Sequence, residues 1–209
     1  NRITFVGNTT TRDNVIRREI DQTGLRNSRV MIIDAPEAIG MGESLLAFRK
    51  KKASSIRVGA QLVKDGRAEA FVSMGNTGAV VYISRDVLGS LKGVDRPALA
   101  LLVPGVEGQT LLIDVGANAN CQPHNLVQFA VMGKIFMEAV VGVSDPRVGL
   151  MSIGEEKGKG NDLVRQTFDR LQAAPLRFIG NVEGKDLFSG VAGNCHRTCQ
   201  NNLLTFGNR

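Results

Sequence analysis

The chain has 209 residues, of which 43% are hydrophobic and 22% charged, a balance typical of a globular protein with a sizeable core. This composition excludes a disordered chain and a coiled coil. The apolar runs are short or interrupted by charged residues, so we expect none of them to cross a bilayer.

The net charge of +6 and the isoelectric point near 9.5 favour acidic partners in general: phosphate, an acidic protein, anionic lipid or nucleic acid. Aromatic residues make up only 5% of the chain and Trp is absent, so few side chains could stack on bases. We therefore expect no nucleic acid partner.

Three cysteines, in a chain that opens on a strand pattern rather than a leader segment, indicate reduced thiols and a cytoplasmic location. Cys195, His196 and Cys199 are spaced closely enough to suggest a metal. A structural zinc site needs four ligands, and no obvious residue completes the set, so we expect no metal.

Seven apolar runs predict strands, which in chain order cover residues 2–7, 29–35, 69–73, 98–103, 110–115, 147–153 and 176–182. Helical patterns are found at residues 13–20, 54–66, 79–91, 123–141 and 160–172. This alternation predicts an α/β fold, with a mixed, mostly parallel, doubly wound (Rossmann-like) sheet and helices on both faces. Only GVEG separates the fourth and fifth strands, so these two should pair antiparallel.

Four Gly- and Asn-rich loops follow predicted strands: GNTG (75–78), GAN (116–118), GEEKGKGN (154–161) and GNVEGKD (180–186). Ligands of such sheets bind at the carboxyl ends of the strands, so we expect the loops to converge on one cleft. GNTG also opens a helix, whose first N–H groups are unpaired and bind anions.

The loops lack the spacing of a P-loop, of a dinucleotide fingerprint and of a serine nucleophile elbow. They carry amide, hydroxyl and charged groups, which taken singly are also common in turns and helix caps. Lys159 follows Glu155 and Glu156, so a salt bridge is the alternative to phosphate binding by this lysine.

In this order, MGNTGA, GVDRPALA, LLIDVGAN, LVQFAVMG, PRVGLMSIGEEKGKGND and FIGNVEGKDLFSG resemble phosphate acyltransferases of the PlsX type, from bacterial phospholipid synthesis. The resemblance runs from Ile3 to about Ala192. It implies transfer of a fatty acyl group from acyl carrier protein to inorganic phosphate, which gives acyl phosphate. It also implies a fold related to phosphotransacetylases and isocitrate dehydrogenases, a homodimer, peripheral membrane association, and neither metal nor nucleotide cofactor.

In such a reaction phosphate is the nucleophile, so the protein must bind the dianion and stabilise the developing oxyanion. Under this hypothesis the catalytic residues are Lys159, Asn161, Asn76 and Asn118. The residues expected to bind phosphate or substrate are Gly75, Asn76, Thr77, Gly78, Asp114, Asn181 and Glu183. The basic run Arg49–Lys52 would dock the acidic carrier protein.

The sequence departs from the family pattern at both ends. The family begins with a further strand and a Gly- and Asp-rich loop, and continues past residue 192 into a loop of the DGFVGN kind. We therefore expect residues 1–192 to form a partial acyltransferase domain and residues 193–209 an atypical polar tail. The alternatives are phosphotransacetylase-like transfer from coenzyme A and an inactive binding scaffold.

Overall fold

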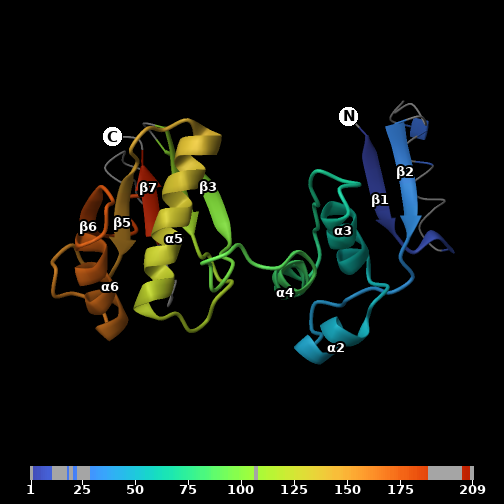
Figure 1. Cartoon of the computed structure of the whole chain (residues 1–209), viewed down its shortest axis with the longest axis horizontal. Helices are drawn as coiled ribbons and strands as arrows, with labels where there is room; N and C mark the ends of the chain where they lie inside the picture. The colour runs from blue at the N-terminus through green and yellow to red at the C-terminus, as the bar shows by residue number, and fades with distance from the viewer. Residues whose placement is uncertain are drawn as a thin grey trace. The chain divides into compact units, whose positions relative to one another are not determined.

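The structure is a computed structural model that describes residues 2–10, 18, 21–22, 29–105, 108–187 and 204–207. It divides into two compact units, Asn1–Lys92 (unit 1) and Gly93–Arg209 (unit 2). Figure 1 shows both units with their elements labelled. The helix predicted over residues 13–20 lies almost entirely outside the described residues.

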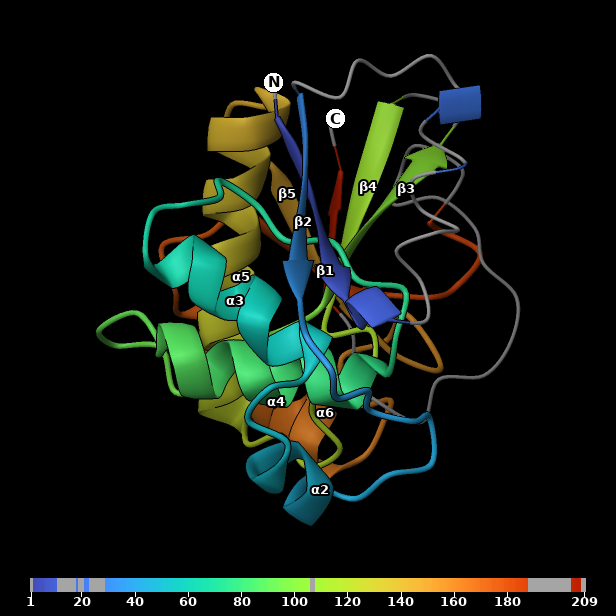
Figure 2. The ribbon, with the colours of Figure 1, turned by 90° about the vertical axis from the view of Figure 1, so that its right-hand side faces the viewer.

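Among its described residues, unit 1 contains a two-stranded parallel sheet and the three helices α2, α3 and α4. The strands β1 (Ile3–Gly7) and β2 (Val30–Asp34) run side by side, as Figures 1 and 2 show. The helices are α2 (Leu45–Lys50), α3 (Ser55–Lys64) and α4 (Thr77–Leu88). A small core joins the helices, made of Phe48, Ile56, Ala60, Ala79, Ile83 and Val87.

The end of α3 confirms the predicted stop. The helix ends at Lys64, and Gly66 follows with φ of +68°, a left-handed conformation that favours glycine. Ser54 precedes the helix as expected, although its side chain makes no capping hydrogen bond.

The strand predicted over residues 69–73 is wrong: this segment is irregular. Phe71 and Ser73 are half-buried, whereas Val72 and Met74 are exposed, so burial alternates along the segment as it would in a strand. Phe71 packs against Gly59 of α3, where its ring leaves no room for a Cβ atom. Within the described residues no strand pairs with this segment, and alternation without a partner does not make a sheet.

Unit 2 is built on a five-stranded sheet with strand order β3-β4-β7-β5-β6. Its strands are β3 (Ala100–Gly105), β4 (Gly108–Ile113), β5 (Arg147–Met151), β6 (Phe178–Val182) and β7 (Leu204–Gly207). The predicted antiparallel pair is confirmed as β3 and β4, with Ala100 opposite Ile113. The fold is thus mixed α/β, with parallel and antiparallel pairings.

Strand β7 comes from the segment predicted to be an atypical polar tail. It lies between β4 and β5 and runs antiparallel to both. The sheet of unit 2 is therefore not mostly parallel, because β5 with β6 is its one parallel pairing among the described strands. The proposed boundary at residue 193 lies outside the described residues and stays a prediction.

The long helix predicted over residues 123–141 is confirmed. It forms α5 (Pro123–Phe136) and continues as a single π-helical turn, η2 (Met137–Val141), which Gly142 ends with φ of +81°. Gln122 and Asn125 form a reciprocal capping box at its start.

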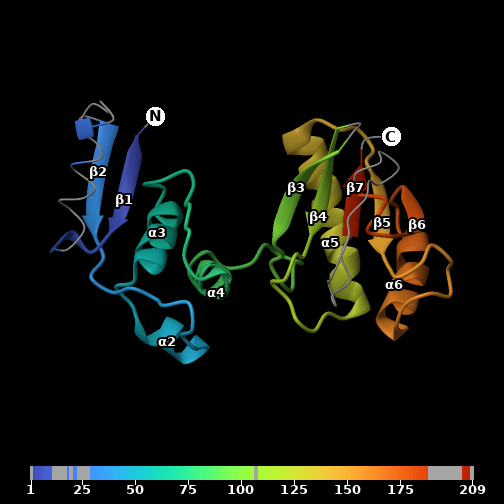
Figure 3. The ribbon, with the colours of Figure 1, turned by 180° about the vertical axis from the view of Figure 1, so that it is seen from behind.

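Helix α5 packs against α6 (Asp162–Gln172), and both contact the sheet, so they cover the same face. Figure 3 shows the sheet from the opposite side. In the described part of unit 2, helices on both faces of the sheet are therefore not seen. The core between α5, α6 and the sheet includes Leu111, Leu126, Phe129, Leu150, Val164 and Leu171.

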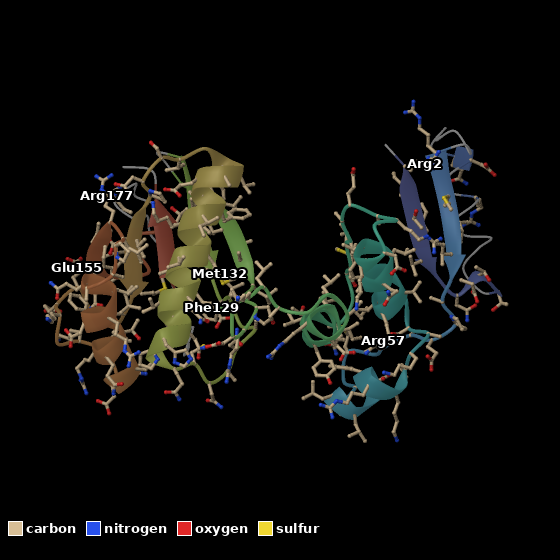
Figure 4. The ribbon with its side chains drawn as sticks, viewed as in Figure 1. Arg2, Arg57, Phe129, Met132, Glu155 and Arg177 are labelled. Atoms are coloured by element: carbon tan, nitrogen blue, oxygen red, sulfur yellow. The ribbon has the colours of Figure 1, made fainter. Side chains whose placement is uncertain are left out.

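Phe129, labelled in Figure 4, is fully buried in this core, whereas Val131 on the same helix is 41% exposed. We expect Phe129→Ala to lower the free energy of unfolding by about 3–5 kcal/mol, because it removes buried apolar atoms and leaves a cavity. Val131→Ala should cost less than about 1 kcal/mol. Urea unfolding followed by circular dichroism measures both, and equal losses would contradict the position of α5 in the core.

Candidate functional site

Three of the four predicted loops leave the sheet of unit 2 at the same edge. Strands β4 and β5 both run antiparallel to β7, and β6 runs parallel to β5, so β4, β5 and β6 point in one direction. The ladder places Ile113, Leu150 and Asn181 in one row, with Leu204 of β7 between the first two. Neighbouring strands lie about 4.8 Å apart, so β4 and β5 are separated by about 10 Å.

Asp114 directly follows β4 in an uncommon backbone conformation. Its φ is +68°, its side chain is buried at 1% exposure, and its N–H donates to the carbonyl of Leu99 at 2.6 Å. Positive φ in a residue other than glycine carries strain and is best tolerated by Asn and Asp. The chain thus holds a buried carboxylate at the strand end.

The carboxylate of Asp114 is bound to the loop that follows. Its Oδ1 accepts a hydrogen bond from Nδ2 of Asn118 at 2.9 Å, and the same Nδ2 also donates to the carbonyl of Pro97 at 2.9 Å. Asp114 and Asn118, both predicted site residues, are therefore in contact. Asp114 orients the Asn118 side chain, and the amide nitrogen of Asn118 is already engaged.

Cys121 lies on the other oxygen of the same carboxylate, with Sγ 3.6 Å from Oδ2 of Asp114. Burial, followed by the negative charge of Asp114, raises the pKa of the Cys121 thiol to about 11. The thiol is thus a weak hydrogen-bond donor and a poor nucleophile near neutral pH. The described residues contain no cluster of His, Cys, Asp and Glu that could hold a metal ion, and Cys195, His196 and Cys199 lie outside them.

The loop after β5 leads into α6, and Asn161 caps this helix. Oδ1 of Asn161 accepts a hydrogen bond from the N–H of Val164 at 3.0 Å, and Gly160 before it has φ of +92°. The cap uses the side-chain oxygen of Asn161 and leaves its NH2 group exposed to solvent.

The lysines near this loop differ in their partners. Lys157 forms an ion pair with Asp169 at 3.0 Å and lies 5.2 Å from the ring centre of Phe168. The ammonium group of Lys159 forms no hydrogen bond or ion pair with any described residue, and the side chain is exposed. The salt bridge that was the alternative for Lys159 is therefore not present in the structure.

Glu155, labelled in Figure 4, is instead paired with Lys185 of the loop after β6, at 2.8 Å. Lys185 also contacts Glu183 at 3.2 Å, and hydrogen bonds to the two carboxylates raise its pKa. Glu183, a predicted substrate ligand, thus takes part in a bridge between two loops. Lys185 was not predicted as a site residue, and its spacing from Glu183 gives no signal in the sequence.

Asn181, at the end of β6, also contacts the loop after β5. Its Nδ2 donates to the carbonyl of Glu156 at 3.0 Å, and the residue is only 6% exposed. Its Oδ1 and the hydroxyl of Ser152 are buried and have no hydrogen-bond partner among the described residues. Ser152, which was not predicted as a site residue, is therefore a further buried polar group at the start of this loop.

The GNTG corner belongs to unit 1. Asn76 caps α4 by accepting from the N–H of Ala79 at 3.0 Å, and its Nδ2 donates to the carbonyls of Gly40 and Met41 at 3.1 and 2.9 Å. Both polar atoms of its side chain are thus used within the protein. Thr77 and Gly78 are exposed at the first turn of α4.

The predicted glycines of the corner are not needed for backbone conformation, since neither Gly75 nor Gly78 has a positive φ among the described residues. At Gly78 the constraint is space, because a Cβ atom would lie 3.3 Å from Oδ1 of Asn76. The structure thus brings Asp114 and Asn118 together, and joins Asn181 and Glu183 to the loop of Lys159 and Asn161. It places the GNTG corner in the other unit.

A family model described as "Fatty acid synthesis protein" matches residues 1–193. The chain belongs to this family. Among its relatives, proteins named phosphate acyltransferase are 52% identical over 169 residues in Acidobacterium capsulatum and 51% identical over 183 residues in Heliobacterium modesticaldum. A third protein of that name, from Aquifex aeolicus, is 46% identical over 165 residues.

These alignments cover 79%, 86% and 79% of this chain, but 50%, 55% and 49% of the three relatives. The chain thus spans about half the length of the family members it matches. No described helix is both long enough and apolar enough to cross a membrane.

The raised pKa of Cys121 predicts slow alkylation. At pH 8 a thiol of pKa about 11 is about 0.1% thiolate, against about 10% for an ordinary thiol, so iodoacetamide should react about 100-fold more slowly than with an exposed cysteine. Asp114→Asn removes the neighbouring charge and tolerates positive φ, so it should speed the reaction. Mass spectrometry of the Cys121 peptide measures the rate, and fast alkylation of the folded protein would contradict the burial of the thiol.

The two asparagine caps should differ in their contribution to stability. Asn161→Ala removes one capping bond and should cost about 1 kcal/mol. Asn76→Ala also leaves the carbonyls of Gly40 and Met41 without their donor, so we expect a loss of about 2–3 kcal/mol. Chemical denaturation compares the two, and equal losses would show that the bonds to Gly40 and Met41 add nothing.

Proposed function

We propose that the protein transfers a fatty acyl group from acyl carrier protein to inorganic phosphate and releases acyl phosphate for phospholipid synthesis. The names of the relatives support an acyltransferase that uses phosphate. The acyl carrier protein as donor rests on the resemblance of the sequence to the PlsX type. The reaction takes place at the edge of the sheet of unit 2 that carries Lys159 and Asn161.

The observation that carries this proposal is the unpaired ammonium group of Lys159. Lys157 and Lys185, close to it in the chain or on the adjoining loop, have carboxylate partners, whereas Lys159 has none among the described residues. An exposed cation beside the N-terminus of α6 favours a doubly charged anion, because the helix dipole and the lysine act in the same direction.

In the proposed reaction a phosphate oxygen attacks the carbonyl carbon of the thioester. A C–O bond forms, the C–S bond breaks, and the departing thiolate takes a proton to give the free thiol of the carrier. Lys159 neutralises phosphate and stabilises the charge that develops on the carbonyl oxygen. The free NH2 group of Asn161 donates a hydrogen bond to the same anion. No serine or cysteine nucleophile is needed, since phosphate itself attacks.

The other site residues act mainly by position. Asp114 holds Asn118, and Asn181 fixes the loop that carries Lys159. Glu183 contacts Lys185, which in turn pairs with Glu155 of that loop. In unit 1, the exposed residues Thr77 and Gly78 in the first turn of α4, with Gly75 just before the cap Asn76, are proposed as a further anion-binding element.

The resemblance to the PlsX type supports further proposals. We propose a Rossmann-like fold related to phosphotransacetylases and isocitrate dehydrogenases, a homodimer, and a cytoplasmic protein that associates peripherally with the membrane surface. No metal or nucleotide takes part in the proposed chemistry.

Lys159→Met tests the central role. In the full-length protein, we expect kcat/KM for phosphate to fall by at least about 100-fold, because one preorganised cation is lost from the transition state. Lys157→Met is the matched control: it removes a cation of the same loop that is already paired with Asp169, and should change kcat/KM less than about threefold. Acyl phosphate is followed with acylated carrier protein and, separately, with acyl coenzyme A.

If both lysine variants lose activity equally, the special role of Lys159 is wrong. If the folded, unmodified protein makes no acyl phosphate from either donor, the proposed reaction is wrong. If acyl phosphate forms only from acyl coenzyme A, coenzyme A is the donor and the proposed site is retained.

A further inference from the structure

The surface around α2 combines exposed apolar side chains with cations. Met41, Leu45 and Leu46 are 76%, 59% and 62% exposed. Leu46 and Lys50 are four residues apart on α2, so their side chains are neighbours on one face of the helix. We use the name α2 patch for Met41, Leu45, Leu46, Lys50 and Lys52.

Two of the four cations in the basic run Arg49–Lys52 are committed to the protein itself. Lys51 donates to the carbonyl of Ala38 and to Glu43, both at 2.6 Å. The guanidinium of Arg49 donates to the hydroxyl of Tyr82 and lies 5.8 Å from the centre of its ring. These two cations therefore contribute to the structure of unit 1.

The other two lysines, Lys50 and Lys52, are exposed, and their ammonium groups form no hydrogen bond or ion pair with the described residues. Lys52 helps to lower the pKa of Asp86, but the main cause is the hydrogen bond from Arg57 to that carboxylate. The patch thus presents two positive charges beside three apolar side chains, which is the composition of a small binding surface with a charged rim.

We infer that the α2 patch is the docking surface for a small acidic protein, whose carboxylates face Lys50 and Lys52 and whose apolar side chain meets Leu46. This inference rests on the proposed function, in which a carrier protein brings the acyl group. Charge complementarity selects the partner: rim lysines steer an acidic surface into place, while the apolar contact at the centre supplies the anchor.

A lipid surface fits the patch less well. Helix α2 has six residues, whereas helices that lie in a membrane interface are longer and have a continuous apolar face. Each lysine near an anionic membrane contributes about 1 kcal/mol, so two unpaired lysines give weak attachment. A protein partner needs fewer cations, because shape and burial at its centre add to the charge.

The position of the patch suits the delivery of a substrate. Asn76, the cap of α4, donates to the carbonyl of Met41 in the patch and to that of Gly40 just before it, so a direct hydrogen bond joins the patch to the GNTG corner. A carrier protein docked at Met41 would therefore stand beside the corner proposed to bind phosphate.

The test uses the full-length protein, with fluorescently labelled acyl carrier protein as the probe. In the double variant Lys50→Glu, Lys52→Glu we expect the Kd to rise at least about tenfold at low salt, with a smaller difference at high salt. Leu46→Ser should weaken binding by a factor that salt does not change. For the double variant, KM for acyl carrier protein should rise, while kcat and KM for phosphate stay unchanged.

Lys64→Glu is the matched control, since Lys64 is an exposed lysine at the far end of α3, about 14 Å along the helix axis from Ser55. It should change the Kd less than about twofold. An equal loss in Lys64→Glu would overturn the inference, because net charge alone would then explain binding. Unchanged binding of carrier protein by the double variant would also overturn the inference. So would a double variant that still binds carrier protein but no longer binds phosphatidylglycerol vesicles.

The experiment distinguishes failure of this inference from failure of the proposed function. A protein that binds carrier protein through the α2 patch but makes no acyl phosphate keeps this inference and loses the proposed function. A protein that makes acyl phosphate equally well with and without Lys50 and Lys52 keeps the function and loses this inference.

Discussion

The hydrogen-bonded ladder through β4, β7, β5 and β6 is the constraint on which the site depends. It sets one direction for three strands and one row for Ile113, Leu150 and Asn181. All the loops that follow these strands must then leave the sheet on one side. Strand β7 supplies the link, since it bonds to β4 on one edge and to β5 on the other. It therefore helps to set the spacing between the Asp114 loop and the Lys159 loop.

On this frame, short polar contacts decide which groups are available to a ligand. Asn181, buried under the Glu156 carbonyl, joins the loops after β5 and β6, and breaking such a buried bond costs about 1–3 kcal/mol. The surface bridge of Lys185 to Glu155 and Glu183 is exposed to solvent and adds little stability. Its effect is selective: it takes up Glu155, one of the two upstream carboxylates that could have paired with Lys159.

The sequence predicted much of this architecture, because periodicity and short connections have direct physical consequences. The GVEG connection required the antiparallel pair β3 and β4, and the Gly66 stop and the long α5 helix were likewise readable. The pattern of residues 69–73 does not show whether a neighbouring strand is available to pair with them. In the structure Phe71 packs against Gly59 of α3, and no described strand pairs with the segment. Strand β7 was missed because a four-residue strand in a polar segment carries almost no periodic signal.

The site was predicted unevenly for the same reason. Gly- and Asn-rich loops revealed where polar groups collect, but the identity of each lysine's partner depends on distances across the fold, which a linear pattern does not encode. The division into two units, which assigns GNTG to unit 1 and the other three loops to unit 2, was also not readable from local patterns.

The double role of Asn76 has a thermodynamic consequence. One side chain both closes the first turn of α4 and holds the carbonyls of Gly40 and Met41, so a shift of this loop disturbs the helix end. Any ligand that displaces Met41 and any anion at the first turn of α4 are therefore coupled. Such coupling is reciprocal: the factor by which one ligand alters the affinity of the other is the same in both directions. A delivery protein and an anion would thus regulate each other's residence on this unit through a single amide group.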